Sequence, residues 1–167
     1  MDVKILAALL NVLSAARRGT RAQAGSIYLR EADGLRFLVT QNDELARSLG
    51  HQDAADLLMR TVLPWAERSI AAWVARNRTT VNVPDAYAIR PDAPYVFNRR
   101  IDETTGFRTT SMLVVPLRYP IDGVLQLLNA TDERGEVIPF SLAAEVAVLE
   151  MLAVESEATF GTLGGQA

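Results

Sequence analysis

The chain has 167 residues, of which 49% are hydrophobic and 22% charged, with a net charge of −3. This size and composition predict one globular domain with its own core, and the acidic balance gives no general attraction to nucleic acid. The sequence contains no cysteine, which excludes disulfides, thiolate metal sites and catalytic thiols. Its single histidine, His51, cannot form a multi-histidine metal centre and is expected in an exposed polar turn.

The N-terminal segment predicts an amphipathic helix rather than a signal peptide. Apolar side chains recur at spacings of three and four over residues 3–17, which indicates a helix over residues 3–18 with Gly19 as its C-cap. No apolar stretch approaches the ~18–20 residues of a membrane-spanning helix. We therefore expect a cytoplasmic protein that contacts neither a membrane nor nucleic acid.

A β-hairpin and several helical turns come next. Residues 24–30 and 35–41 alternate between apolar and polar side chains, and the Asp-Gly pair at 33–34 is a strong hairpin turn. Helical turns are expected after the Asn-Asp pair at 42–43 and after Asp53, because these side chains are favoured N-caps.

A long irregular segment occupies the middle of the chain. A short helix is predicted within residues 67–78 and a short strand over 80–83, and then residues 84–110 show neither helical nor strand periodicity. Connections beyond ~12–15 residues are uncommon in compact domains and are usually functional or disordered. Because this one carries four aromatic side chains, we expect an ordered pocket lid, with a helical turn around Tyr95–Arg100.

The last third of the chain predicts a second hairpin and a long helix. Residues 111–117 and 123–130 are the strongest strand signals, with Pro116 expected at an unpaired position or a bulge. A C-terminal helix is predicted over residues 141–160, followed by a tail over 161–167. Hairpins between terminal helices indicate an α+β fold with an antiparallel sheet. The apolar surface of those helices exceeds what one sheet face covers, which favours a homodimer.

Three stretches carry a family resemblance: SIAAWVARNRTTVNVPDAYAI from Ser69, IDETTGFRTTSMLVVPL from Ile101 and GVLQLLNA from Gly123. Together they resemble the GAF domains of cyclic-nucleotide phosphodiesterases and bacterial cyclases. The resemblance implies a PAS-like α+β fold, in which a central six-stranded antiparallel sheet has the terminal helices packed on one face and a lidded pocket on the other. Residues 1–167 would then form a single GAF domain, which is a regulatory fold rather than an enzyme.

The resemblance also implies a ligand and a set of pocket residues. In the phosphodiesterase type the pocket holds cyclic AMP or cyclic GMP, and no other cofactor is expected. Hydroxyls and helix-start amides suit a cyclic phosphate, and Gln126 offers a donor and an acceptor to a base edge. Arg108 pairs either with a ligand phosphate or, as a lid clamp, with Asp85, Asp102 or Glu103. The positions implied to bind ligand are Ser26, Ile70, Ala71, Asp85, Asn98, Thr105, Phe107, Arg108, Thr109 and Gln126.

The chain departs from the family pattern at several of these positions. Ser69 and Ala72 replace the two glycines of the family's Gly-Ile-Ala-Gly helix start, which costs the close backbone approach that glycine permits. Asn98 stands where phosphodiesterases often stack an aromatic side chain on the base. The family's Asn-Lys-Phe-Asp-Glu signature is retained only at Asn129, Phe140 and Glu145.

Two functions are consistent with these residues. The retained hydroxyls and the long lid favour a small-molecule sensor, whereas the incomplete signature favours a ligand-free module for dimerisation or protein interaction. In both, the regulated output is expected on another part of a longer chain or on a partner protein, or it is absent. Catalysis by Asp102 and Glu103 is not expected, because adjacent carboxylates usually diverge and no nucleophile or base accompanies them.

Overall fold

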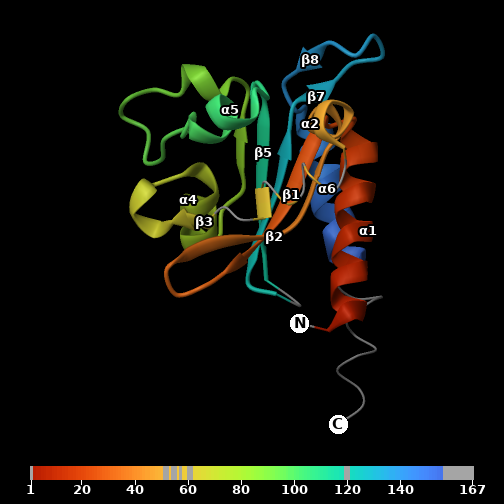
Figure 1. The fold of residues 1–167 in the computed structure, drawn as a ribbon, viewed down its shortest axis with the longest axis vertical. Helices are drawn as coiled ribbons and strands as arrows, with labels where there is room; N and C mark the ends of the chain where they lie inside the picture. The colour runs from red at the N-terminus through yellow and green to blue at the C-terminus, as the bar shows by residue number, and fades with distance from the viewer. Residues whose placement is uncertain are drawn as a thin grey trace.

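The computed structural model describes residues 2–50, 53, 56, 58–59, 62–118 and 121–155 (Figure 1). His51, most of the helical turn expected after Asp53, the end of the predicted C-terminal helix beyond residue 155 and the tail over 161–167 lie outside the described residues.

An antiparallel sheet forms the centre of the molecule, as the sequence predicted. Its strand order is β3-β2-β1-β6-β5-β4, and every neighbouring pair is antiparallel. The two predicted hairpins lie side by side, because β1 pairs with β6 along its length. A small second sheet pairs β7 with β8. The strands are β1 (Ala24–Arg30), β2 (Gly34–Asn42), β3 (Val62–Pro64), β4 (Val81–Val83), β5 (Met112–Leu117), β6 (Gly123–Leu128), β7 (Ala130–Thr131) and β8 (Val137–Ile138).

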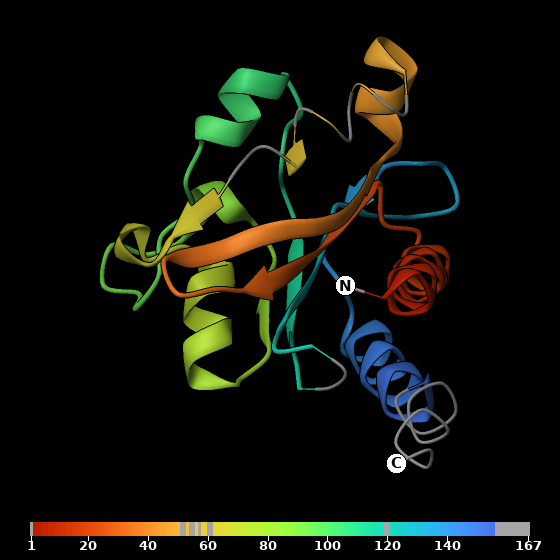
Figure 2. The ribbon, with the colours of Figure 1, turned by 60° about the horizontal axis from the view of Figure 1, so that its bottom comes forward.

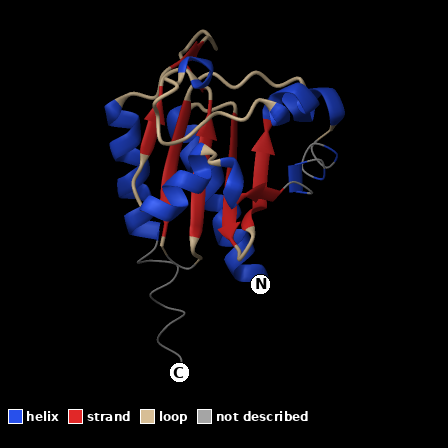
Figure 3. Ribbon diagram, turned by 90° about the vertical axis from the view of Figure 1, so that its left-hand side faces the viewer, coloured by secondary structure: helices blue, strands red, loops and turns tan. Residues whose placement is uncertain are grey.

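The helices divide between the two faces of the sheet. The terminal helices α1 and α6 pack against each other on one face, whereas α4 and α5 lie on the other (Figures 1 and 2). Viewed from that second face, irregular chain segments pass in front of the strands (Figure 3). This arrangement is the one that the family resemblance implied. The helices are α1 (Val3–Thr20), α2 (Asp43–Leu49), α4 (Ile70–Asn77), α5 (Arg100–Thr105) and α6 (Leu142–Glu155), with 3₁₀ turns η1 (Trp65–Glu67) and η2 (Ala86–Ala88).

Each face of the sheet has its own hydrophobic core. Tyr28, Phe37 and Val114 pack beneath α4 and the lid, whereas Ile27 and Leu125 pack beneath α1 and α6. A β-bulge separates the two sets in β2, since Ile27 pairs with Val39 but Tyr28 pairs with Phe37. The extra residue at the bulge, Leu38, therefore packs into the same core as its neighbour Val39, whereas Phe37 packs into the other.

The end of α1 differs from the sequence prediction. Gly19 is not the C-cap, because the helix continues to Thr20 and Arg21 takes the left-handed conformation, with φ of 53°. The Thr20 hydroxyl donates to the carbonyl of Ala16 at 2.8 Å, and the amide of Ala22 donates to the carbonyl of Arg17 at 3.0 Å. These bonds satisfy the last turn without a glycine.

The helical turn of the lid also lies later than predicted. The sequence placed it around Tyr95–Arg100, whereas α5 begins at Arg100 and ends at Thr105, and Gly106 is its left-handed C-cap, with φ of 74°. Asn98 accepts a hydrogen bond from the amide of Arg100 at 2.9 Å, which starts the helix. Pro116 lies at a position that is unpaired on one side, as expected. It pairs with β6, but the pairing of β5 with β4 ends before it, at Val114.

Candidate functional site: a small cavity under the lid

Two adjoining hollows lie under the lid, on the sheet face opposite the terminal helices. The strand-side hollow, of about 60 Å³, is bounded by β1, β2, β6 and α5, and the helix-side hollow, of about 50 Å³, by the start of α4 and the lid. They belong to one site, because they share six lining residues. The shared residues are Tyr28, Phe97, Asn98, Ile101, Met112 and Gln126.

Most of the residues implied by the resemblance lie at these hollows. Ser26, Thr105, Phe107 and Thr109 line the strand-side hollow, Ile70 and Ala71 line the helix-side hollow, and Asn98 and Gln126 line both.

Asp85 and Arg108 are not brought into the lining. Asp85 instead caps η2, where it accepts a hydrogen bond from the amide of Tyr87 at 2.9 Å. The guanidinium of Arg108 lies 3.6 Å from the ring centroid of Tyr87. Among the described residues Arg108 forms no ion pair with Asp85, Asp102 or Glu103, so the expected carboxylate clamp is replaced by a cation–π contact.

Polar side chains of the sheet bond to one another across the floor of the site. The hydroxyls of Ser26 and Thr40 lie 2.8 Å apart, joining β1 to β2. The amide of Gln126 donates to the hydroxyl of Tyr28 at 2.9 Å, joining β6 to β1. Burial raises the pKa of Tyr28, so its hydroxyl stays protonated and can serve as both donor and acceptor. The floor is therefore uncharged.

A helix N-terminus and an arginine both line the helix-side hollow. The first turn of α4 lines it through Ile70 and Ala71, and Ser69 caps that helix by accepting from the amide of Ala72 at 3.2 Å. Arg100 lines the opposite side and lies 3.4 Å from the carboxylate of Glu67. A helix N-terminus together with an arginine favours an anionic group at this end of the site.

The lid is held closed by a buried carboxylate. Asp102 of α5 accepts hydrogen bonds from the amide and the hydroxyl of Thr109, both at 2.8 Å, and from the hydroxyl of Tyr87 at 2.9 Å. Burial, followed by the bond to Asp102, raises the pKa of Tyr87. Arg99 and Arg108 both lie over the Tyr87 ring, and we call these five residues the lid clasp.

The retained parts of the family signature anchor the end of the lid. Buried Asn129 accepts from the amide of Thr110 and donates to the carbonyl of Arg108, both at 2.7 Å. Glu145 of α6 accepts from the side-chain amide of Asn82 at 3.0 Å, which ties β4 to the C-terminal helix. These residues therefore have structural partners although the lysine and aspartate of the signature are absent.

Several lining residues were missed by the sequence analysis. Ala24 and Tyr28 line the strand-side hollow, and the two-residue period of a strand would have placed them on the same face as Ser26. Thr40 and Asn42 also line it, but the bulge in β2 breaks that period before them. Asp102 was considered only as an acid or a clamp partner, because an aperiodic lid gives no sign of which carboxylate points inward.

The described residues contain neither a candidate metal site nor a membrane-spanning helix. No group of three or more His, Cys, Asp or Glu side chains converges there on a position that could hold a metal ion. No helix in the same part of the chain is long and apolar enough to cross a membrane.

A six-stranded antiparallel sheet, with paired terminal helices on one face and a lidded cavity on the other, defines the PAS-like class of small sensor folds. The chain belongs to the GAF domain family, whose sequence profile matches residues 5–159.

Sequence relatives include much longer phosphodiesterases. The chain is 39% identical over 78 residues to a dual 3′,5′-cyclic-AMP and -GMP phosphodiesterase 11A of Takifugu rubripes, a match that covers 45% of the chain and 8% of the relative. It is 30% identical over 119 residues to a cGMP-specific 3′,5′-cyclic phosphodiesterase of Drosophila ananassae, covering 68% of the chain and 10% of that protein. The chain thus spans about a tenth or less of these relatives.

Solved structures share the fold at lower identity. The GAF domain/HD domain protein of Geobacter sulfurreducens superposes with a TM-score of 0.68 at 10% identity, covering 95% of this chain and 94% of the other. A free methionine-R-sulfoxide reductase of Neisseria meningitidis gives a TM-score of 0.61 at 21% identity, covering 93% and 77%. At these identities the likeness concerns the fold alone.

Proposed function

We propose that this GAF domain is a regulatory sensor that binds a small molecule under the lid, with cyclic AMP or cyclic GMP as the candidate ligands. One observation carries the proposal: an uncharged polar floor adjoins a helix N-terminus and Arg100. Such a site matches a ligand with a neutral hydrogen-bonding part and an anionic part. The phosphodiesterase relatives, which act on cyclic nucleotides by name, support the choice of candidates.

Binding of a ligand this large requires the lid to move. The hollows measure about 60 and 50 Å³, whereas pockets for small organic ligands usually measure roughly 300–1,000 Å³. The present structure is therefore the closed state, and a ligand would favour an open arrangement of the lid by population shift. Release of the lid clasp is the step that this shift requires.

The signal would leave through a homodimer of the terminal helices. On α6 the side chains of Leu142, Val146 and Leu149 are exposed, although they are apolar. A second copy of the chain covering this face would bring together the α1 and α6 helices of both protomers. An output domain elsewhere in a longer chain, or a partner protein, would respond to their rearrangement.

A second candidate function is a ligand-free module for dimerisation or protein interaction. The observation that favours it is that the polar groups of the cavity already have partners, namely Gln126 with Tyr28 and Thr109 with Asp102. No buried side-chain polar atom among the described residues lacks a hydrogen bond. A site that satisfies itself needs no ligand to be stable.

A thermal-shift panel separates the two functions. The panel would contain cyclic AMP, cyclic GMP, cyclic dinucleotides, nucleobases and amino acids. A ligand at ~100 times its dissociation constant adds about 2.7 kcal/mol to the free energy of unfolding, which raises the melting midpoint by several degrees. We expect one cyclic nucleotide to give such a shift.

Thr105→Ala and Thr104→Ala form a matched pair for this experiment. Both hydroxyls donate to the carbonyl four residues earlier at 2.8 Å, but Thr105 lines the cavity and Thr104 is exposed. The ligand-induced shift should shrink in Thr105→Ala and persist in Thr104→Ala. A flat panel, with the protein still dimeric, would contradict the sensor and favour the interaction module.

A further inference from the structure

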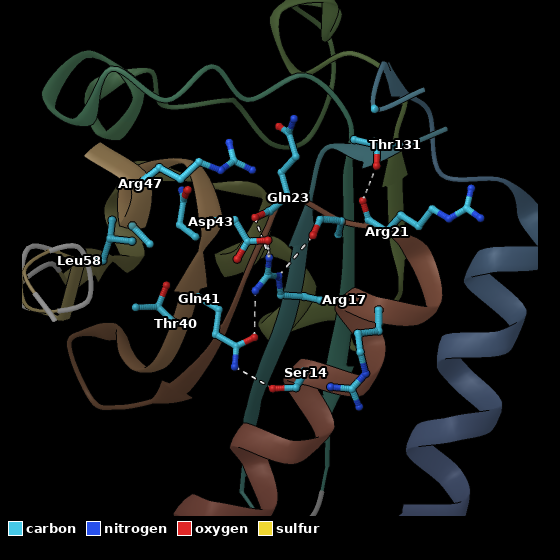
Figure 4. A pocket seen from close by; sticks show the side chains of 15 residues that line it. Ser14, Arg17, Arg21, Gln23, Thr40, Gln41, Asp43, Arg47, Leu58 and Thr131 are labelled. Carbon is cyan, nitrogen blue, oxygen red and sulfur yellow. Dashed lines mark hydrogen bonds and ion pairs between the residues drawn. The ribbon is translucent and has the colours of Figure 1, made fainter. Parts of the chain in front are cut away.

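A hollow larger than the two under the lid lies outside that cavity. It is an open cleft of about 640 Å³ between the C-terminal end of α1, the junction of β2 with α2, and the β7–β8 hairpin (Figure 4). We call it the arginine cleft, because four of its lining residues are arginines. These are Arg17, Arg18, Arg21 and Arg47.

The charge of this cleft opposes the charge of the whole chain. Its lining holds four arginines and one carboxylate, Asp43, a formal charge of +3, whereas the chain carries −3. A further acid, Glu133, lies 3.6 Å from Arg21, and both side chains are largely exposed. The cleft is therefore a local electropositive basin on an acidic protein.

The floor of the cleft is rigidly built around Arg17. Its guanidinium donates to the side chain of Gln41 at 3.0 Å and to the carbonyl of Gln23 at 2.8 Å, and it pairs with Asp43 (Figure 4). Gln41 in turn donates to the hydroxyl of Ser14 at 2.8 Å. Arg17 thus has its charge matched and its donors occupied, so it shapes the cleft rather than serving as its free cation.

Arg18 and Arg47 are the cations left available. Within the part of the chain that the structure describes, neither side chain has a hydrogen bond or an ion pair, and both are exposed. They reach the cleft from different helices, α1 and α2. Arg21 contributes less, because its side chain extends away from Arg17 in Figure 4.

A helix-end role alone does not account for Arg18. Basic residues in a last turn often complement the helix dipole, but three carbonyls near the end of α1, those of Ala16, Arg17 and Arg18, already have partners. The carbonyl of Arg18 accepts from the amide of Arg21 at 3.3 Å, and the carbonyl of Ala16 accepts from the hydroxyl of Thr20 at 2.8 Å. The Arg18 guanidinium is therefore free to bind a solute.

We propose that the arginine cleft is a second binding site, for a small multiply charged anion of the pyrophosphate or organic phosphate class. Guanidinium groups bind phosphate oxygens through paired, charge-assisted hydrogen bonds. The volume of about 640 Å³ lies within the usual range for small-molecule pockets. The lining contains no aromatic residue to stack on a base, which favours a compact anion over a nucleobase-bearing one.

The site adjoins the cavity under the lid without being part of it. Thr40 and Asn42, at the end of β2, line both the arginine cleft and the strand-side hollow. The two sites differ in their other polar groups, since the floor under the lid is uncharged and the cleft is cationic.

Isothermal titration with sodium pyrophosphate tests the proposal, with sodium chloride of equal ionic strength as the blank. We expect the wild-type chain to bind pyrophosphate, and Arg18→Gln and Arg47→Gln each to raise the dissociation constant about tenfold. The double variant should lose measurable binding. Arg118→Gln, which removes another exposed arginine, from the β5–β6 turn, is the matched control and should bind as the wild type does.

Three results would overturn the proposal. The first is no heat above the chloride blank in the wild type. The second is an equal loss of affinity in Arg118→Gln, which would reveal general charge screening. The third is unchanged affinity in Arg18→Gln and Arg47→Gln together with a lower melting midpoint, which would assign both arginines to helix stability.

Discussion

At the scale of single residues, Asp102 and Asp85 show how two aspartates of one lid take different roles. Asp102 is buried and accepts three hydrogen bonds, two from Thr109 and one from Tyr87. Asp85 is exposed and accepts one bond, from the amide of Tyr87, at the start of η2. The carboxylate of Asp102 therefore carries more of the lid's stability than that of Asp85.

Asp102→Asn should destabilise the protein by about 1–3 kcal/mol. The side-chain NH2 group of asparagine cannot accept a hydrogen bond, so it would leave a donor of Thr109 or Tyr87 without an acceptor. Asp85→Asn should be nearly neutral, because asparagine caps a turn as well as aspartate does. Urea unfolding measures both free energies. Faster hydrogen exchange at the Thr109 amide in Asp102→Asn would report opening of the lid. Equal stabilities for the two variants would show that the lid clasp does not hold the lid.

At the scale of secondary-structure elements, two glycines near helix ends should respond oppositely to replacement by alanine. Gly19 lies inside the last turn of α1, with open space where a Cβ would lie. Gly106 is the left-handed C-cap of α5, with φ of 74°. Gly19→Ala should stabilise the protein by about 0.5–1 kcal/mol, and Gly106→Ala should destabilise it by roughly 1–2 kcal/mol. Chemical denaturation of both variants checks these signs. Loss of stability in Gly19→Ala would instead support the C-cap role that the sequence suggested.

The same elements show how far sequence reasoning reaches. The strand over Ala24–Arg30 and the Asp33-Gly34 turn carry local signals, and both were predicted correctly. The C-terminal end of α1 and the position of α5 were predicted wrongly, because several competing stop signals lie close together and tertiary contacts decide between them. In the candidate site, the motif placed Thr109 and Gln126 correctly at the cavity. The partner of Arg108 depended on the path of an aperiodic lid, which no periodicity specifies.

At the scale of the whole molecule, the apolar face of the terminal helices bears on the proposed dimer. Val146→Glu combined with Leu149→Glu should reduce the particle mass towards that of one 18.3 kDa chain, because two carboxylates cannot be buried unpaired in an interface. Val62→Glu, on the edge strand β3, is the control and should leave the mass unchanged. Light scattering after size-exclusion chromatography measures both. An unchanged mass for the double variant would place the contact elsewhere.

The end of β2 separates the two proposed binding sites, since Thr40 and Asn42 line both the arginine cleft and the cavity under the lid. A ligand in the arginine cleft and a ligand under the lid would therefore both contact the same stretch of β2 backbone. Thermodynamic linkage then makes the effect reciprocal: an anion that raises the affinity of the cavity for its ligand by some factor has its own affinity raised by that same factor. A domain built in this way would respond to the simultaneous presence of two solutes rather than to the concentration of one.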